Sequence, residues 1–340
     1  MRGNTRKPGW KGPTIREIAR LAGVGEATVD RVLNNRLNVR EKTRLRVAAA
    51  LEKLTRDRTG QNDALDIALF SESGATFNAA LAAAALDVNR SVPGVRVTGH
   101  YETTSGLDPA IFARQLESIG LESDGEFVVA RDHPAINRAI RKLRSTGIPV
   151  ICLTTDLPSS RRSAYIGNDQ VAAGCVAGLL IGRALPREPA SILIVSSVPY
   201  RCQQDRENGC RRALRTDFPH LKLEERVISD EVPESTCESL LQHFTMHGMP
   251  AAIYNVAGAN RGVARALEQV GATGRTIFVG HELTSISRTL LETGAIDYVI
   301  SHDFCGELTA AARWIRENIE GVRVEPSFSQ ILIHTRHNCT

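Results

Sequence analysis

Hydrophobic and polar positions follow a helical period at the start of the chain. Thr14 and Glu17 form a capping box, in which each side chain can accept from a free amide at the helix start. Gly23 ends this helix, because glycine adopts the left-handed conformation without a Cβ clash. The helix has one apolar face, made up of Ile15, Ile18, Ala19 and Ala22.

Two further helices are expected before residue 60. A short one spans about Glu26 to Leu33, and Asn34-Asn35 interrupts it. A third begins near Asn38. A helix, a turn containing glycine and a short helix are typical of the helix-turn-helix motif. We therefore predict an all-α head over residues 1–60 with a core over 14–54. Its inward positions are Val29, Val32, Leu33, Val47, Leu51 and Leu54, and Arg40, Lys42, Arg44 and Arg46 stay in solvent.

From Leu65 onward, short apolar runs alternate with helical stretches. This alternation predicts parallel sheets covered by helices, and nine or more strands favour two doubly wound lobes over one barrel, which periodicity alone leaves open. We assign 61–340 to this α/β domain. The expected strands are Leu65–Phe70, Val95–His100, Glu126–Ala130, Pro149–Leu153, Tyr165–Gly167, Ser191–Ser196, Lys222–Ile228, Ala251–Val256, Thr276–Gly280 and Ile296–Ile300. The expected helices are Asn78–Arg90, Ala110–Ile119, Pro134–Arg144, Val171–Arg183, Arg206–Arg215, Arg261–Val270 and Glu307–Ile319.

Charge divides the chain in the same place. The net charge is +4 overall, but residues 1–60 hold fifteen Lys and Arg against six Asp and Glu, so the head carries +9 and the rest −5. A cationic module joined to an anionic one is typical of a nucleic-acid-binding head, and a solvated basic tail is the alternative.

Composition excludes several other classes. No stretch approaches the roughly 20 apolar residues that span a bilayer, and the basic start of the chain is no secretory signal, so we expect a cytoplasmic protein. The seven cysteines form no Cys-x-x-Cys pair and are expected as reduced thiols. We find no dinucleotide fingerprint, phosphate loop or nucleophile elbow, and His243 and His247 lack the Glu of a zinc motif. No enzyme activity, cofactor or metal is expected.

The second helix would present its first residues to base edges in the major groove. Arg31 could pair with guanine, Glu26 with a cytosine amine, and Ala27 with a thymine methyl. Glu26 and Asp30 could instead only cap a helix whose arginines bind phosphate.

The stretch from Thr14 to Asn34, with Thr43, Arg44 and Val47, closely resembles the DNA-binding head of the lac repressor (LacI/GalR) family. Gly25 and Asp30 stand where the family usually has serine, and a carboxylate at 30 would repel phosphate. The linker after Leu54 lacks the family's proline and apolar wedge, so Arg56 and Arg58 could contact phosphate or a narrow minor groove. The expected DNA-binding residues are Thr14, Gly25, Glu26, Ala27, Thr28, Arg31, Asn34 and Arg56.

Polar residues follow almost every expected strand of the large domain. Ligands of open α/β sheets bind beyond the carboxyl ends of the strands, and such a ring could satisfy sugar hydroxyls while an aromatic covers an apolar sugar face. Polar residues are also simply common in loops. The expected ligand-binding residues are Phe77, Asn78, Asp132, Asp156, Arg206, Asn255, Glu282 and Asp303.

Residues 65–334 resemble the type I periplasmic-binding-protein fold that lac repressor relatives use as a sensor. The resemblance lies in Tyr165–Asp169, Arg206–Gly209 and Gly280–Glu282. It implies that Arg206 holds ligand hydroxyls, that Glu282 replaces a ligand-binding Asp, and that the chain crosses between lobes near 166, 301 and 325.

Together these features predict a dimeric, possibly tetrameric, nucleoid-associated transcription regulator that binds an operator in double-stranded DNA. By the resemblance it represses sugar or polyol uptake and catabolism genes. Its small polar effector is a sugar or polyol, with purines also open, and its effect on DNA binding is open too. The alternatives are a solute-binding protein of a transport system, which predicts a signal peptide, and an α/β enzyme with a DNA-binding appendage, which predicts a phosphate loop or a nucleophile.

Overall fold

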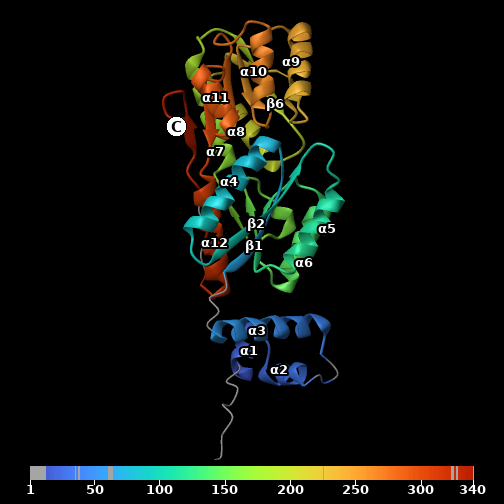
Figure 1. Ribbon diagram of the computed structural model, residues 1–340. Helices are drawn as coiled ribbons and strands as arrows, with labels where there is room; N and C mark the ends of the chain where they lie inside the picture. Colours follow the sequence, from blue (N-terminus) through green and yellow to red (C-terminus); the bar gives the residue numbers. More distant parts are fainter. Residues whose placement is uncertain are drawn as a thin grey trace, which may run out of the picture. The chain divides into compact units, whose positions relative to one another are not determined.

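The chain divides into two compact units, one made of the residues up to Ala64 and the other of nearly all residues from Leu65 onward. The structure is a computed structural model, and it describes residues 13–34, 36, 39–59, 64–224, 226–322, 325–326 and 328–339. We call the two units the head and the body and describe each by itself (Figure 1).

The head consists of α1 (Ile15–Ala22), α2 (Glu26–Leu33) and α3 (Glu41–Thr59). Thr14 and Glu17 form the predicted capping box, and Gly23 ends α1 at a φ of 59°. α3 begins at Glu41 rather than Asn38 and continues past Leu54 to Thr59. The buried core of the head is formed by Ile18, Ala19, Ala22, Val29, Val32, Val47 and Ala50.

Two apolar residues expected in this core lie at its surface. The side chain of Ile15 is 38% exposed and that of Leu33 is 42% exposed. Arg46 is exposed as expected, and it also donates from Nη2 to the carbonyls of Ala22 and Gly23. It thereby satisfies carbonyls at the end of α1 that have no partner within the helix.

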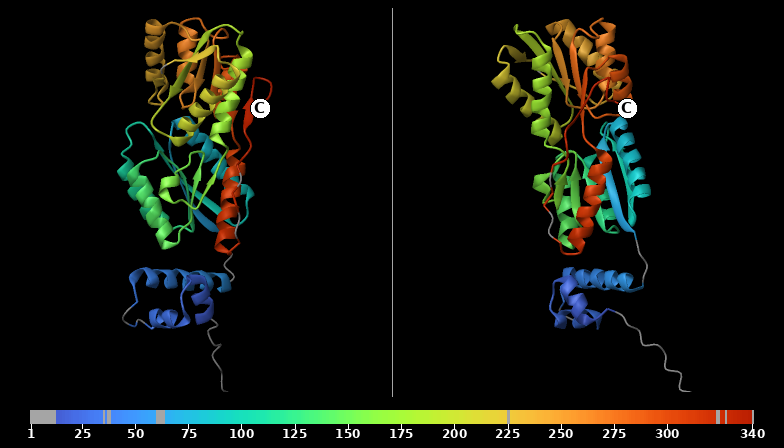
Figure 2. Two further views of the ribbon diagram at one scale, coloured as in Figure 1. Left: turned by 180° about the vertical axis from the view of Figure 1, so that it is seen from behind. Right: turned by 90° about the vertical axis from the view of Figure 1, so that its left-hand side faces the viewer.

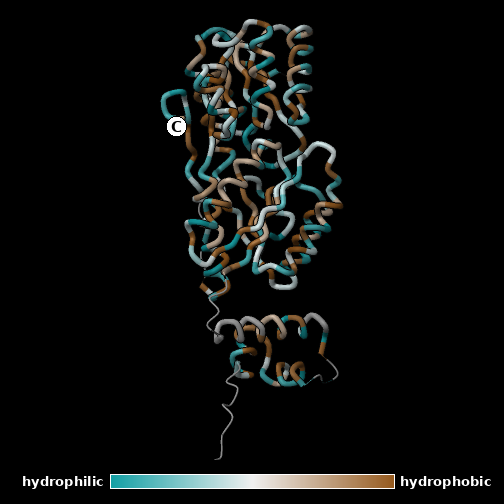
Figure 3. The backbone as a smooth tube through the Cα atoms, viewed as in Figure 1, coloured by the Kyte–Doolittle hydropathy of each residue, from teal (hydrophilic) through white to brown (hydrophobic). Residues whose placement is uncertain are grey.

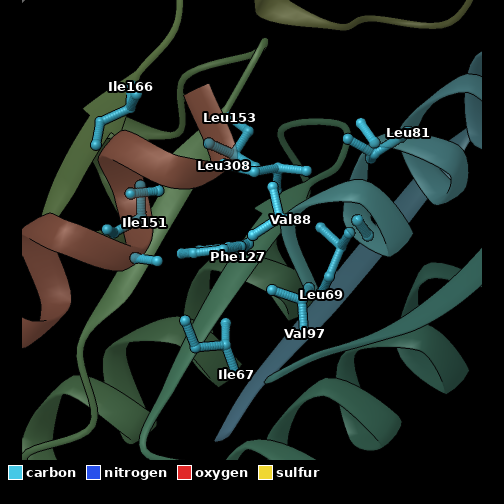
Figure 4. Close-up of a cluster of buried hydrophobic side chains, with 14 of the residues drawn as sticks. Ile67, Leu69, Leu81, Val88, Val97, Phe127, Ile151, Leu153, Ile166 and Leu308 are labelled. Carbon is cyan, nitrogen blue, oxygen red and sulfur yellow. The ribbon is translucent and has the colours of Figure 1, made fainter. Parts of the chain in front are cut away.

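The first lobe of the body is a parallel sheet in the order β2-β1-β3-β4-β5. Its strands are β1 (Leu65–Ser73), β2 (Val95–Thr103), β3 (Gly125–Val129), β4 (Val150–Leu153) and β5 (Ala164–Ile166). One face is covered by α4 (Ala75–Ser91) and α12 (Phe304–Ile319), and the other by α5 (Pro109–Gly120) and α6 (Pro134–Thr146) (Figure 2). Figure 4 shows strand side chains such as Phe127 and Ile151 converging with Val88 of α4 and Leu308 of α12.

The second lobe is a sheet in the order β12-β11-β10-β9-β6-β7, with β8 also paired to β6. All its pairings are parallel except that of β11 with β12. Its strands are β6 (Ala190–Ser196), β7 (Leu221–Leu223), β8 (Val227–Ile228), β9 (Ala252–Asn255), β10 (Ile277–His281), β11 (Tyr298–Ser301) and β12 (Leu332–His334). One face packs against α7 (Gln170–Ala184) and α8 (Arg201–Asp217), the other against α9 (Pro233–His247), α10 (Asn260–Gln269) and α11 (Ser285–Thr293).

The connections between the lobes follow β5, β11 and α12. The expected strand over 222–228 is in fact two strands, β7 and β8, while α9, α11 and β12 were not expected. Along the helices, hydrophobic and hydrophilic stretches alternate (Figure 3). Within the described residues, no helix combines the length and hydropathy needed to span a bilayer.

Helices α7 and α8 approach each other closely at two glycines, which fixes the position of Arg206. A Cβ on Gly174 would lie 1.9 Å from the backbone oxygen of Arg206, and one on Gly209 would lie 2.0 Å from that of Val171. No side chain fits at such distances, so glycine is required at both positions. The backbone of Arg206 is therefore held against α7, and this contact determines the point on α8 from which the Arg206 side chain extends.

Candidate DNA-binding surface and ligand cavity

The outer face of α2 carries most of the residues expected to contact DNA. Val29 and Val32 are buried in the head, which turns the opposite face of the helix outward. Arg56 lies in α3, and its side chain is outside what the structure describes. Thr14 is exposed as the N-cap of α1 and Thr28 is half-buried, while the exposed residues on or flanking α2 are Gly25, Glu26, Ala27, Arg31 and Asn34.

The carboxylate of Asp30 has partners within the head. Asn34 Nδ2 donates to Asp30 Oδ1 at 2.8 Å, and Arg36 Nη1 lies 3.5 Å from Asp30 Oδ2. A nearby guanidinium partly offsets the negative charge, so the repulsion of a DNA phosphate expected at this position is reduced.

A cavity of about 190 Å³ lies between the two lobes of the body. It is formed at the carboxyl ends of strands from both sheets, where β1, β3, β4, β8, β9 and β10 end. This is the place where open α/β sheets bind ligands. Its polar lining consists of Ser73, Thr76, Thr154, Thr155, Tyr200, Gln203, Arg206, Glu231, Asn260, Arg261, His281, Glu282 and Thr284. Its apolar lining includes Phe77, Val129, Pro233, Val256 and Ile286.

Arg206 and Glu282 form a buried ion pair in the wall of this cavity. Arg206 Nη2 donates to Glu282 Oε1 at 2.8 Å, and its Nε donates to Gln170 Oε1 at 2.7 Å. Its Nη1 donates to the carbonyl of Val256 at 3.3 Å. These bonds fix the plane of the guanidinium, which therefore presents a rigid edge toward the cavity.

His302 and Glu307 lie behind this ion pair and continue the row of charges. His302 Nε2 is 3.1 Å from Glu282 Oε2, a charge contact without hydrogen-bond alignment, and its Nδ1 is 2.7 Å from Glu307 Oε2. Burial alone would lower the pKa of His302, but the carboxylates of Glu307 and Glu282 raise it to about 10. Burial would raise the pKa of Glu282, yet His302 and Arg206 hold it well below its usual range. The row therefore alternates in sign and its charges cancel.

Backbone strain is concentrated at the cavity. Among the described residues, five non-glycine residues have a positive φ, and four of these line it: Thr154, Glu231, Ala259 and Glu282. Residues other than glycine adopt this conformation rarely, and they do so most often at ligand-binding and active sites. The strain is an independent sign that the cavity is functional.

Of the eight residues expected to bind ligand, three line the cavity: Phe77, Arg206 and Glu282. Asn78 and Asn255 are buried beside it and hold loops in place. Asn78 donates to the carbonyls of Ser73 and Glu102, and Asn255 donates to the carbonyl of Gly258. Their amides are occupied by backbone groups instead of facing the cavity.

The three other expected residues are outside the lining. Asp132 is exposed and accepts from Asn137 Nδ2 at 2.6 Å. Asp156 forms an ion pair with Arg162, which donates from Nε to Oδ1 and from Nη2 to Oδ2. Asp303 is the exposed N-cap of α12, where it accepts from the amide of Gly306 at 3.0 Å.

Several lining residues were not among those expected, notably Thr154, Thr155, Gln203, Glu231 and Asn260. Glu231 follows β8, so the rule that selected the other strand ends applies to it as well. Gln203 lies one turn before Arg206 on α8, on the same helix face. Asn260 is the first residue of α10, where its Nδ2 donates to the carbonyl of His281 at 3.0 Å and its Oδ1 accepts from Asn255 Nδ2 at 2.8 Å.

Tyr200 joins the two lobes across the cavity. From the N-cap of α8 in the second lobe, its hydroxyl donates to the carbonyl of Glu72 in the first lobe at 2.6 Å. Thr104 Oγ1 lies 2.8 Å from the same hydroxyl oxygen. Because the tyrosine proton is given to Glu72, Thr104 must be the donor in the second bond.

Each of the two units matches a known protein family. Residues 61–322 match the periplasmic binding protein domain family, and residues 14–55 match the bacterial regulatory proteins of the lacI family. The chain therefore belongs to the family of periplasmic binding protein domains, and its head matches the DNA-binding part of the lacI family of bacterial regulatory proteins.

Individual relatives match one unit each. The HTH-type transcriptional regulator TreR of Salmonella typhimurium is 58% identical over 40 residues, which are 12% of this chain and 13% of that regulator. The glucose-galactose binding protein GanP from Geobacillus stearothermophilus matches 81% of this chain and 99% of its own, at 20% identity and a TM-score of 0.72. A solute binding protein from Burkholderia graminis, in complex with D-arabinose, covers 82% and 98% at 18% identity and a TM-score of 0.73. At these identities the two structures establish the fold alone.

Proposed function

We propose that this chain is a ligand-responsive transcription regulator that binds a specific operator in double-stranded DNA. Residues 1–60 form the DNA-binding head, and residues 61–340 form the domain that senses the ligand and dimerises. The proposal rests on one combination within this chain. An outward-facing recognition helix is joined to a domain with a polar cavity between two lobes, and several residues that line this cavity have strained backbone angles.

The proposal includes a homodimer in the cytoplasm, bound at the nucleoid, because two heads can address two half-sites of one operator. The effector is a small polar molecule of the sugar or polyol class, and the regulator represses genes for its uptake or breakdown. The cavity serves binding and not catalysis. The match of the head to the lacI family of bacterial regulatory proteins favours a regulator over a solute-binding protein of a transport system.

The proposal is tested by enriching operator sequences from random duplex DNA with the full-length protein at near-physiological salt. We then expect Arg31→Ala to lower specific affinity by about 10- to 100-fold, since a bidentate base contact is worth about 1–3 kcal/mol. Non-specific affinity, which phosphate attraction dominates, changes little.

Arg187→Ala is the matched control, because Arg187 is an exposed arginine of the body. It should leave operator affinity unchanged. Failure to enrich any sequence, with and without sugars and polyols present, would overturn the proposed function. An unchanged affinity of the Arg31 variant would remove Arg31 from base recognition.

A further inference from the structure

Glu231 places a carboxylate in the cavity that the charge row of Arg206 and Glu282 does not include. It follows β8 in the second lobe and has a left-handed φ of 67°. A Cβ added to Gly74 would lie 3.0 Å from Glu231 Oε2, and one added to Gly258 would lie 3.5 Å from it. The oxygen is therefore wedged between a glycine of each lobe.

The two oxygens of this carboxylate differ in their partners. Oε1 accepts from Ser197 Oγ at 2.8 Å, with Gln203 Nε2 at 3.4 Å and the amide of Gly258 at 3.5 Å. Oε2 is buried and has no hydrogen-bond partner among the residues that the structure describes. A buried acceptor left without a donor destabilises the protein.

Glu231 also lacks a counter-charge. The other buried charges of the cavity wall cancel, Arg206 against Glu282 and His302 against Glu307. Arg261 lines the cavity too, but it is exposed, and no ion pair joins it to Glu231 in the described parts of the chain. Burial raises the pKa of Glu231, with the carboxylate of Glu72 adding to the effect. Of the two carboxylates that line the cavity, Glu282 has an ion-pair partner among the described residues and Glu231 has none.

A helix cap is the purely structural explanation for this side chain, because Gly74 is the N-cap of α4. Yet Glu231 Oε2, the oxygen near Gly74, accepts no hydrogen bond from any described residue. Ser197, Gln203 and Gly258, which do bond the carboxylate, all belong to the second lobe. The lobe that carries Glu231 therefore holds one oxygen, and the other lies beside the cavity between Gly258 of that lobe and Gly74 of the first lobe.

We propose that Glu231 selects an effector that carries a protonated amine beside its hydroxyls, such as an amino sugar or amino polyol, and that the ammonium binds Glu231 Oε2. This inference rests on the proposed function and narrows its ligand class. An ammonium supplies both the missing donor and the missing positive charge, whereas a hydroxyl supplies the donor only.

The test compares matched pairs on the full-length protein by titration calorimetry at neutral pH. The pairs are D-glucosamine with D-glucose, D-galactosamine with D-galactose, D-mannosamine with D-mannose, and glucamine with sorbitol. We expect at least one amine to bind ten-fold or more tightly than its hydroxyl partner. Glu231→Gln should reduce that preference below about two-fold, because it removes the charge and retains the shape.

Glu238→Gln is the matched control, since Glu238 is an exposed glutamate of α9, and it should preserve the preference. Should Glu231→Gln fail to fold, Glu231→Asp keeps the charge and should bind the amine more weakly without losing the preference. A preference that survives Glu231→Gln overturns the inference, and so does a panel in which no amine exceeds its hydroxyl partner. A neutral sugar that binds as tightly as its amine partner and shifts operator affinity would overturn the inference alone and leave the proposed function intact.

Discussion

Glu126 carries a second unpaired carboxylate inside the first lobe, and it does not line the cavity. Its side chain is fully buried on β3, and both oxygens lack a hydrogen-bond partner among the described residues. Burial raises its pKa well above the ordinary value of 4.5. Because the folded state holds this proton to a higher pH than the unfolded chain, the contribution of Glu126 to stability is greatest below pH 4.5 and falls as the pH rises toward its folded pKa.

Glu126→Gln should therefore stabilise the body at pH 7 to 8, and the gain over the wild type should shrink as the pH is lowered toward 4.5. A gain of 1 kcal/mol would raise the melting temperature by about 2–4 °C in a unit of this size. Thermal unfolding between pH 5 and 8 measures it. The exposed Glu122→Gln should change nothing. A variant less stable than the wild type at pH 8 would contradict the expectation.

At the scale of residues, the sequence predicts where the cavity lies better than it predicts which residues line it. The carboxyl ends of the strands do line the cavity, and Phe77, Arg206 and Glu282 lie in it. Asn78 lies in the first turn of α4 and Asp303 is the N-cap of α12, and both bond to backbone groups instead. Sequence patterns do not show whether a loop side chain turns inward to its own loop or outward to the cavity, because several hydrogen bonds of similar strength compete for it.

At the scale of secondary-structure elements, Arg46 of α3 caps the C-terminus of α1. Its guanidinium donates to the carbonyls of Ala22 and Gly23, which accept no hydrogen bond from an amide of the helix itself. Arg46→Ala should raise the hydrogen-exchange rate of α1 amides about five-fold, which corresponds to a lost hydrogen bond of roughly 1 kcal/mol.

Hydrogen exchange of the full-length chain, followed by mass spectrometry, checks this prediction peptide by peptide. Peptides of the body should exchange as in the wild type, which makes them an internal control. Arg46→Lys retains the charge without the planar fork and should give an intermediate rate. An unchanged rate for α1 in Arg46→Ala would show that the contact contributes nothing to the head.

Elements were predictable where apolar residues marked their buried face. The helix α9 buries Thr236 and His243 along with Leu240 and Phe244, so its inward stripe is partly polar and escapes a hydrophobic pattern. The helix α11 begins with a capping box of Thr284 and Ser287, in which serine replaces the expected Glu or Gln. The antiparallel β12 is only three residues long and gains its strand pairing from β11, which no local pattern reveals.

For the whole molecule, the bond network of Tyr200 connects ligand binding to lobe closure. Tyr200 bonds Glu72 and Thr104 of the opposite lobe only when the lobes are together, as in this structure. A ligand that contacts both lobes favours the same arrangement, and it can shift DNA affinity only through its preference for one arrangement over the other. The Tyr200 bonds set part of that equilibrium before any ligand binds.

Thr104→Val should therefore weaken effector binding although Thr104 does not line the cavity. Loss of one hydrogen bond of about 1 kcal/mol shifts the equilibrium toward the open arrangement about five-fold, and effector affinity falls with the closed fraction once that arrangement is no longer dominant. Tyr200→Phe removes the same bond together with the one to Glu72, so the two substitutions should be non-additive. Calorimetric titration of the single and double variants measures the coupling. Full additivity would mean that the two residues act independently, and that closure is governed elsewhere in the cavity.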